Sequence, residues 1–195
     1  MEEEVGRQLD WHAVAVPSQP LEVELGDLLD ALEAPAPSPA GGTAAAVAAA
    51  MAASLVVMVG RGSPAWPDGA AVALDAGAAR ERLLELGAED VEAFAAVLAA
   101  FRTSADPRDS LIHAAEVPLE IAKLAAQVAE LAARAGRDGK RPLSADAEVA
   151  AVLASAACRA AMLVVRANLA AIPSDDRAAA LLRAVREVEG RASTI

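Results

Sequence analysis

One carboxylate lies where the sequence pattern otherwise places apolar side chains. Asp90 shares a helical stripe with Phe94, Val97 and Phe101, whereas the acidic residues beside it point elsewhere. A carboxylate that faces a protein core must be paired with another group or must line a pocket. Asp90 is therefore a candidate general acid or base, and the alternative is a structural salt bridge or a partner for a helix end.

Three other polar residues have a structural explanation beside a functional one. Asn168 lies on the apolar side of its helix, where a buried amide needs hydrogen-bond partners. Asp146 lies in the first turn of a helix, where a negative charge complements the helix dipole. Glu116 lies on a solvated stripe by its spacing, unless a kink at Pro118 turns it inward. We expect the same proline to free the backbone carbonyl of Ala114.

The remaining chemical signals are weak. Gly41 and Gly42 would leave backbone N–H groups open to an anion or a carbonyl oxygen, although close helix packing explains two glycines equally well. His12 and His113 are far apart, and no spacing typical of a metal site occurs, so we predict no metal. We interpret His113, on an apolar stripe, as a structural histidine. No phosphate-binding loop and no GxSxG sequence is present.

The elements that must position these residues are helices. Alanine accounts for 54 of the 195 residues and aromatic residues for 2%, a composition that excludes an all-β fold. Thr43 or a neighbouring glycine can begin the second helix, and Ser144 can cap the fifth. The hydrophobic periodicity predicts helices over about 25–32, 43–60, 71–104, 107–135, 145–171 and 176–190.

Two of these helices are apolar on nearly every side. Residues 43–60 carry no charge, and beyond the first turn of 145–171 only Arg159 and Arg166 are charged. A helix that is apolar all round is buried all round, and one small bundle buries two such helices most simply by association. We predict an all-α bundle of about five to six helices, with these two at its centre, that forms a homodimer.

Composition and charge restrict the class of protein. We expect an N-terminal arm at 1–20 and a single helical domain over 21–195. The net charge of −11 and the lack of a basic stripe argue against nucleic-acid binding. The acidic start is no signal peptide, and the apolar run 44–60 is short for a membrane span, so we predict a cytoplasmic protein without membrane contact. Cys158 is interpreted as a small buried hydrophobic residue.

Four segments, taken together and in order, resemble the cyclodeaminase/cyclohydrolase family. This family includes the C-terminal domain of formiminotransferase-cyclodeaminase and the bacterial methenyltetrahydrofolate cyclohydrolases. Residues 37–43 (PSPAGGT) resemble its PxPGGG(S/T) signature, and 89–94 (EDVEAF) its DxxAF helix. Residues 114–119 (AAEVPL) resemble its AxEVPL segment, and 144–169 its helix from SDA to NVxxNL. The resemblance covers about residues 22–192.

The resemblance implies a dimer of helical subunits that binds folate near the glycine segment, with a tetrahydrofolate derivative as substrate and no tightly bound cofactor. It implies closure of formiminotetrahydrofolate with loss of ammonia, or opening of the methenyl ring by water. Both reactions transfer protons at a one-carbon unit between two nitrogens. The residues that would carry these roles are Asp90 as acid/base, Asp146 and Glu116 as helpers on the pterin, Gly41, Gly42 and Thr43 lining the site, Asn168 as a hydrogen-bond partner, and Arg61 and Lys140 as contacts for the glutamate carboxylates.

The chain departs from the family pattern at several positions. Ala40 replaces the first glycine of the signature, Val164 replaces the first asparagine of NVxxN, and no TxGK segment follows residue 60. Three interpretations follow: a folate cyclodeaminase or cyclohydrolase, a diverged relative that binds another small ligand, or a non-catalytic helical dimer.

Overall fold

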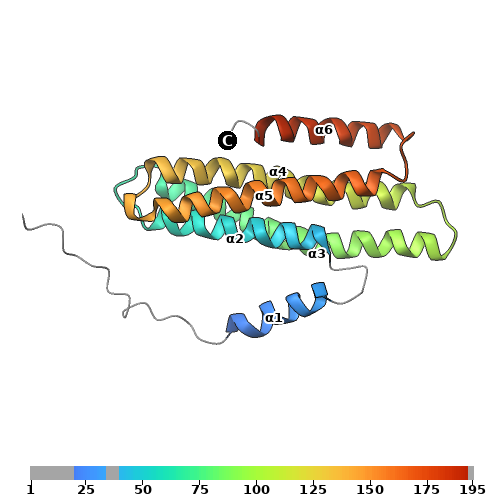
Figure 1. Cartoon of the computed structure of the whole chain (residues 1–195), viewed down its shortest axis with the longest axis horizontal. Coiled ribbons are helices and arrows are strands. Elements are labelled where there is room, and N and C mark those ends of the chain that lie inside the picture. Colours follow the sequence, from blue (N-terminus) through green and yellow to red (C-terminus); the bar gives the residue numbers. More distant parts are fainter. Residues whose placement is uncertain (1–19, 34–39, 193–195) are drawn as a thin grey trace, which may run out of the picture. The chain divides into compact units, whose positions relative to one another are not determined.

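Every regular element in the described part of the chain is helical. The computed structural model describes residues 20–33 and 40–192 (Figure 1). The all-α fold predicted from composition is confirmed. The elements are α1 (Pro20–Glu33), α2 (Gly41–Arg61), α3 (Gly69–Arg102), α4 (Arg108–Asp138), the short 3-10 helix η2 (Arg141–Leu143), α5 (Ser144–Leu169) and α6 (Asp176–Ala192).

The chain forms two compact units, residues 1–36 and 37–195. Helix α1 belongs to the first unit and begins at Pro20, earlier than its leucine spacing indicates. The division into an N-terminal arm at 1–20 and a helical domain over 21–195 stays a prediction. The N-terminal arm, apart from Pro20, and the proline-rich part of the signature lie outside the described residues.

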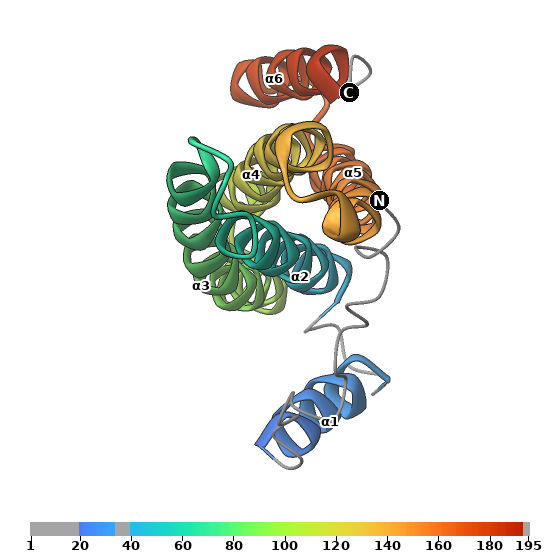
Figure 2. The same cartoon turned by 90° about the vertical axis from the view of Figure 1, so that its left-hand side faces the viewer.

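The second unit is a bundle in which α2 packs between α3 and α5, while α4 closes the other side (Figure 2). Short connections make α2, α3, α4 and α5 alternate in direction. Accordingly, Gly41 at the start of α2 lies beside Val164 near the end of α5, and Gly62 after the end of α2 lies beside Leu143. Helix α6 covers α4 and α5.

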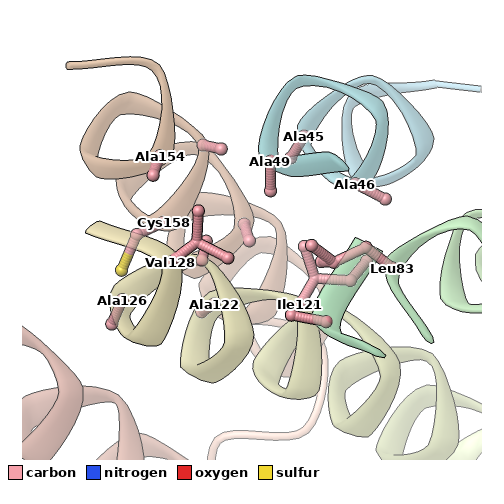
Figure 3. Packing of buried hydrophobic residues seen from close by; sticks show 14 of the residues in the cluster. Ala45, Ala46, Ala49, Leu83, Ile121, Ala122, Ala126, Val128, Ala154 and Cys158 are labelled. Atoms are coloured by element: carbon pink, nitrogen blue, oxygen red, sulfur yellow. The ribbon is translucent and has the colours of Figure 1, made fainter. Parts of the chain in front are cut away.

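Small side chains let these helices approach closely. Ala46 and Ala49 of α2 and Ala122 of α4 are fully buried in the hydrophobic cluster that Figure 3 shows. Near the end of α2 the approach is closer still, because a Cβ on Gly60 would lie 2.5 Å from the carbonyl oxygen of Gly69. The alanine content of the sequence is thus the means by which the backbones come together.

A single chain does not bury α2 and α5 on every side, and the sequence prediction was that part of their apolar surface faces another subunit. Met51 and Met58 of α2 are exposed, and so are Val149, Val152 and Leu163 of α5. By length and composition, α2 and the segment Arg141–Leu169 are long and apolar enough to cross a membrane, but the core helix of a soluble protein passes the same test. Both contribute core residues here.

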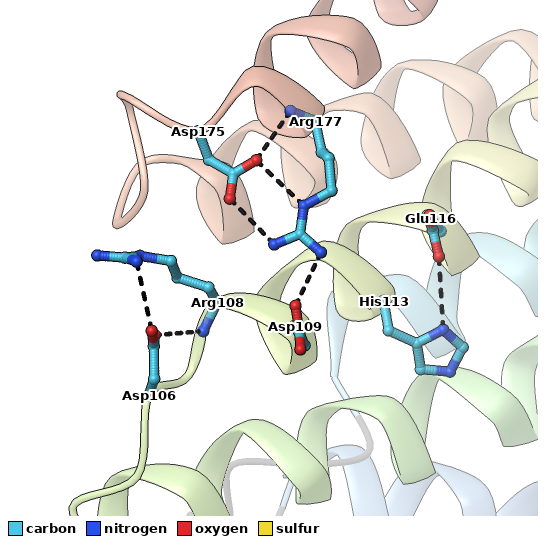
Figure 4. Close-up of polar contacts among 7 residues, drawn as sticks. All are labelled: Asp106, Arg108, Asp109, His113, Glu116, Asp175 and Arg177. Carbon is cyan, nitrogen blue, oxygen red and sulfur yellow. Dashed lines mark hydrogen bonds and ion pairs between the residues drawn. The ribbon is translucent and has the colours of Figure 1, made fainter.

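Several expected helix ends differ in detail. Of the two predicted starts of the second helix, Thr43 or a neighbouring glycine, the glycine is confirmed, because α2 begins at Gly41. Ser144 is the first residue of α5 and makes no side-chain cap. At two other helices, α4 and α6, an aspartate side chain accepts a hydrogen bond from a backbone N–H at the N-terminus. Asp106 accepts a hydrogen bond from the backbone N–H of Arg108 at 3.1 Å, and Asp175 accepts one from Arg177 at 2.8 Å (Figure 4).

Two residues assigned to apolar stripes are exposed. His113, Val117 and Ile121 follow one another at steps of four residues, and each such step rotates the side chain by about 40° around the helix. Val117 and Ile121 therefore face the core, whereas the side chain of His113 faces solvent. Phe101 is 57% exposed for a different reason. Helix α2 begins level with Asp90, so the last turns of α3 extend past it and lose that neighbour.

Candidate active site

The buried carboxylate predicted at Asp90 lies directly over the start of α2. Asp90 is 8% exposed, and its carboxyl group packs against the α-carbon of Gly42. A Cβ at Gly42 would lie 2.5 Å from both Cγ and Oδ2 of Asp90. Glycine is therefore required at residue 42 by space, and the glycine segment and the acidic helix form one site.

Thr43 holds this carboxylate. Its hydroxyl lies 3.3 Å from Oδ2 of Asp90 and 3.2 Å from the carbonyl oxygen of Gly87, and its backbone N–H also bonds to the carboxylate. The first N–H groups of a helix have no partner within the helix and carry a partial positive charge. Asp90 thus satisfies part of the uncapped N-terminus of α2 from another helix.

The environment of Asp90 suits proton transfer. Burial raises the pKa of its carboxyl group above the usual value, and the hydrogen bonds from the hydroxyl and the backbone of Thr43 offset part of that rise. A carboxyl group whose pKa is raised keeps its proton to a higher pH than an exposed carboxyl group does, which favours a role as a general acid. The two sequence interpretations of Asp90, helix-end partner and acid/base group, are compatible in this geometry.

The surroundings of this carboxylate include two further residues. Phe94 follows Asp90 by one turn on the same face of α3 and is half-buried, so it offers an aromatic surface next to the carboxylate. Val164 of α5 lies beside Gly41, 3.6 Å from a Cβ built there. Ala40 is exposed and has a negative φ of −145°, so its methyl group strains no backbone.

Asn168 lies one turn after Val164 on the same side of α5. Its side-chain amide donates a hydrogen bond to the carbonyl oxygen of Ala114 at 2.5 Å. Pro118 is the residue whose missing N–H leaves that carbonyl free, as predicted. The structural interpretation of Asn168 thus has a named partner, and a contact between Asn168 and Asp90 is not among the described interactions.

Glu116 stays on the solvated face of α4. Its side chain is 55% exposed and lies 3.7 Å from Nδ1 of His113, which is exposed as well (Figure 4). The interpretation of His113 as a core histidine is therefore wrong. The described interactions of Glu116 do not include Asp90, and Pro118 does not turn it into the bundle.

The other three expected site residues lie at the far end of the bundle. Arg61 ends α2, about 28 Å from Gly42 at 1.5 Å per residue. Asp146 is in the first turn of α5, at the same end, and Lys140 precedes η2. One subunit therefore brings Gly41, Gly42, Thr43 and Asp90 together, and it does not bring Arg61, Lys140 or Asp146 to them.

A buried serine organises that far end. The Ser63 hydroxyl donates a hydrogen bond to the carbonyl oxygen of Val59 at 2.7 Å and accepts one from the backbone N–H of Lys140 at 2.8 Å. The exposed Lys140 side chain lines a cavity of about 260 Å³ together with Trp66. Sequence reasoning missed Ser63, since a serine in a loop rich in glycine and proline gives no sign that it will be buried.

Arg82, which precedes Asp90 by about two turns of α3, is already neutralised by glutamates. Arg82 bonds to Glu120 of α4 at 2.8 Å and to Glu89 at 2.7 Å, and it also contacts Glu85. These carboxylates raise the pKa of the guanidinium further. Within residues 20–33 and 40–192 there is no group of three or more His, Cys, Asp or Glu side chains suited to a metal ion.

Comparisons with known proteins identify the family to which this fold belongs. A sequence profile of the formiminotransferase-cyclodeaminase family matches residues 24–187. Among solved structures, the formiminotetrahydrofolate cyclodeaminase of Thermotoga maritima is similar, with a TM-score of 0.81 and 27% sequence identity over 89% of this chain and 93% of that one. No curated protein matches the sequence. Because the profile covers most of the chain, the protein belongs to the formiminotransferase-cyclodeaminase family.

Proposed function

We propose that the protein is a folate one-carbon enzyme in which Asp90 acts as the acid/base, and that cyclodeamination of formiminotetrahydrofolate is its reaction. The observation that carries the proposal is the buried carboxyl group of Asp90 at the start of α2, held by Thr43 and seated on Gly42. Cyclodeaminase activity takes precedence over cyclohydrolase activity because the similar solved structure is named a formiminotetrahydrofolate cyclodeaminase.

The reaction requires one proton to leave and another to arrive. The N10 nitrogen attacks the formimino carbon and loses its proton, a new carbon–nitrogen bond closes the ring, and the imino nitrogen leaves as ammonia after it gains protons. A single carboxyl group between the two nitrogens can accept the first proton and deliver it to the leaving nitrogen. Cyclohydrolase chemistry uses the same group to activate water at the methenyl carbon.

The other residues near Asp90 have supporting roles in this proposal. Backbone N–H groups at Gly41 and Gly42 bind a substrate carbonyl oxygen. Phe94 offers one face of its ring to the planar pterin. Thr43 fixes the carboxylate, and Asn168 keeps α4 and α5 in register next to the site through Ala114.

The same proposal includes a homodimer, a cytoplasmic location and no tightly bound cofactor. The homodimer is supported by the exposed apolar residues of α2 and α5, which a second subunit would cover. Twice the subunit mass of 19.7 kDa is the expected mass in light scattering.

The test follows the methenyl chromophore in ultraviolet light. Formiminotetrahydrofolate is added to the purified protein, and cyclodeaminase activity appears as gain of methenyl absorbance together with release of ammonia. In a second assay methenyltetrahydrofolate is the substrate, and cyclohydrolase activity appears as loss of that absorbance faster than in buffer.

The matched variant is Asp90→Asn, which keeps the shape of the side chain and removes its acid/base function. We expect its rate to fall by at least about 10²-fold while its helical circular dichroism stays unchanged. Equal rates for the variant and the wild type would remove Asp90 from the mechanism. If neither folate is converted by the wild type, the departures at Ala40 and Val164 would favour a diverged relative with another ligand.

A further inference from the structure

A row of side chains on α3 connects Asp90 with a cation at the last residue of that helix. The members of this α3 row follow one another at steps of four residues, so each lies about one turn beyond the previous one: Asp90, Phe94, Leu98 and Arg102. Because α2 begins beside Asp90, the other three members lie past the start of α2. The row therefore leads from the buried carboxylate along the part of α3 that α2 does not cover.

The surface of α3 next to Asp90 is open in one direction only. Toward the middle of the helix, Leu86 and Leu83 are fully buried in the core. Toward its end, Leu98 is half-buried, and Phe101, one turn further along, is 57% exposed. A ligand whose reacting atoms lie at Asp90 therefore has room along the end of α3 and none along its middle.

Arg102 differs from the other arginines near this end of the bundle. Three of those arginines share one property, an ion pair with a carboxylate: Arg108 with Asp106, Arg166 with Glu189, and Arg177 with Asp175. Arg102 is exposed, and no ion pair or hydrogen bond of its side chain occurs within the described part of the chain. In a protein with a net charge of −11, such a cation is a local point of attraction for an anionic substrate.

The backbone closes the end of α3 directly after Arg102. Ser104 has a φ of 54°, the left-handed conformation that is common at helix ends. The backbone N–H groups of residues 103–105 donate hydrogen bonds to the carbonyl oxygens of residues 99–101. Long side chains on a helix lean toward its N-terminus, so Arg102 can place its guanidinium over the turn that carries Leu98.

The order of chemical groups along this surface corresponds to the order of groups in a folate. The proposed function places the one-carbon unit at Asp90 and the pterin at Phe94, and beyond them a folate carries a p-aminobenzoyl ring and a glutamate. Leu98 and Phe101 offer an apolar and aromatic surface to the ring, and Arg102 offers paired N–H donors to a carboxylate. Arg102 lies about 12 Å beyond Phe94 along the helix, a gap that a benzoyl ring and one amino acid bridge.

We infer that the end of α3 is the subsite for the p-aminobenzoylglutamate tail of the substrate, with Leu98 and Phe101 against the ring and Arg102 bound to a glutamate carboxylate. This inference rests on the proposed folate function, which sets the position of the reacting atoms. Arg102 is a binding residue that takes no part in proton transfer. It therefore acts on the affinity for substrate and leaves the chemical step unchanged.

The test compares two substrates that differ only in the glutamate, formiminotetrahydrofolate and formiminotetrahydropteroate. Arg102→Gln is expected to raise the KM for the folate by about tenfold, with a smaller change in kcat, and to leave the KM for the pteroate unchanged. Arg102→Lys keeps the charge and should recover part of that loss. Phe101→Ala should raise the KM for both substrates, because both contain the ring.

Arg183→Gln is the matched control, since it removes the same charge from another exposed arginine. Arg183 lies on α6, which packs against α4 and α5. This variant should leave both KM values unchanged. An equal rise of the folate KM in Arg183→Gln and Arg102→Gln would reveal a general effect of net charge and overturn a specific contact at Arg102.

A binding measurement separates this inference from the proposed function. Folinate and its counterpart without the glutamate are titrated into the wild type and Arg102→Gln in a calorimeter. Weaker binding of folinate alone in the variant, with no turnover by the wild type, would support the subsite and defeat the proposed reaction. Turnover by the wild type, with the same preference for the glutamate in wild type and variant, would overturn the subsite and leave the reaction in place. A wild type that binds neither compound would overturn both.

Discussion

The side-chain amide of Asn168 donates a hydrogen bond to the carbonyl oxygen of Ala114, the acceptor that Pro118 leaves without its helical donor. One residue of α5 thus compensates for a proline in α4. The pair explains why an amide occurs on an otherwise apolar side of α5, and it gives the two helices a fixed register next to the site.

A double-mutant cycle tests this compensation. Asn168→Ala leaves the Ala114 carbonyl unsatisfied, and we expect a loss of about 1–3 kcal/mol in the free energy of unfolding. Pro118→Ala restores an N–H four residues after Ala114. In the Pro118→Ala background, Asn168→Ala should lower the free energy of unfolding by much less. Urea unfolding of the wild type, the two single variants and the double variant measures the difference. Equal costs in both backgrounds would show that Asn168 stabilises the protein in another way.

Asp90→Asn should separate activity from stability. Because burial raises the pKa of Asp90 above its ordinary value, the folded protein binds this proton more tightly than the unfolded chain does. Its contribution to stability is therefore present at low pH and is lost as the pH rises through the folded pKa. The variant has no such loss, so it should gain stability relative to the wild type at pH 8 and lose that gain near pH 3, while remaining inactive.

Urea titrations of both proteins at the two pH values provide the measurement. Other titrating groups cancel in the difference between variant and wild type. A difference that does not change with pH would mean that the Asp90 carboxyl group is solvated and titrates normally.

Thr43→Val tests the role of the hydroxyl in setting the pKa of Asp90. Without that donor the carboxylate is less stabilised, so the pKa of Asp90 should rise further and the acidic limb of the pH–rate profile should move to higher pH. Thr43→Ser keeps the hydroxyl and should leave the limb in place. A limb that stays in the same position in Thr43→Val would assign the profile to another group.

Gly42→Ala should reduce activity by displacing the carboxylate of Asp90, the proposed acid/base. The added methyl group would overlap the carboxyl group of Asp90, which must then leave the hydroxyl of Thr43. We expect at least a tenfold loss in kcat with the helical circular dichroism retained.

Gly77→Ala is the matched control for that variant. A Cβ at Gly77 meets only Val57 Cγ2, at 4.0 Å, and the residue lies within α3. This substitution should leave activity unchanged and stabilise the protein by about 0.5–1 kcal/mol, since alanine favours a helix over glycine. Similar activity in both variants would show that the fit of Asp90 over Gly42 does not matter for turnover.

The sequence predicted the fold well because periodicity and alanine content are properties of single helices. The same information placed Asp90 in a buried position and Pro118 opposite an unsatisfied carbonyl. The sequence pattern predicted wrongly that His113 and Phe101 are buried. For Phe101 the pattern does not show where the neighbouring helix starts, and for His113 it does not show how far residues at four-residue steps rotate away from the core. The glycine segment and Asp90 are almost fifty residues apart, so their spacing in the sequence cannot show that they touch. The family resemblance assigned them to one site, and the packing of α2 against α3 brings them into contact.

The expected grouping of Arg61, Lys140 and Asp146 with Asp90 has a different origin. Residues that a family resemblance assigns to one site are expected near each other, but a resemblance does not say which subunit supplies each of them. The length of α2, fixed by Gly41 at one end and Gly62 beyond the other, separates the two sets within one chain.

The alanine interfaces also limit how this protein can evolve. Where fully buried alanines such as Ala46 and Ala122 set the spacing between helices, a larger residue has no room and a smaller one leaves a void, so neutral drift is confined to positions at helix ends and outer faces. The exposed Ala40 and the half-buried Val164 are such positions, and both flank the start of α2, where we propose that the ligand binds. A lineage built on this scaffold can change what it binds far more readily than it can change its shape.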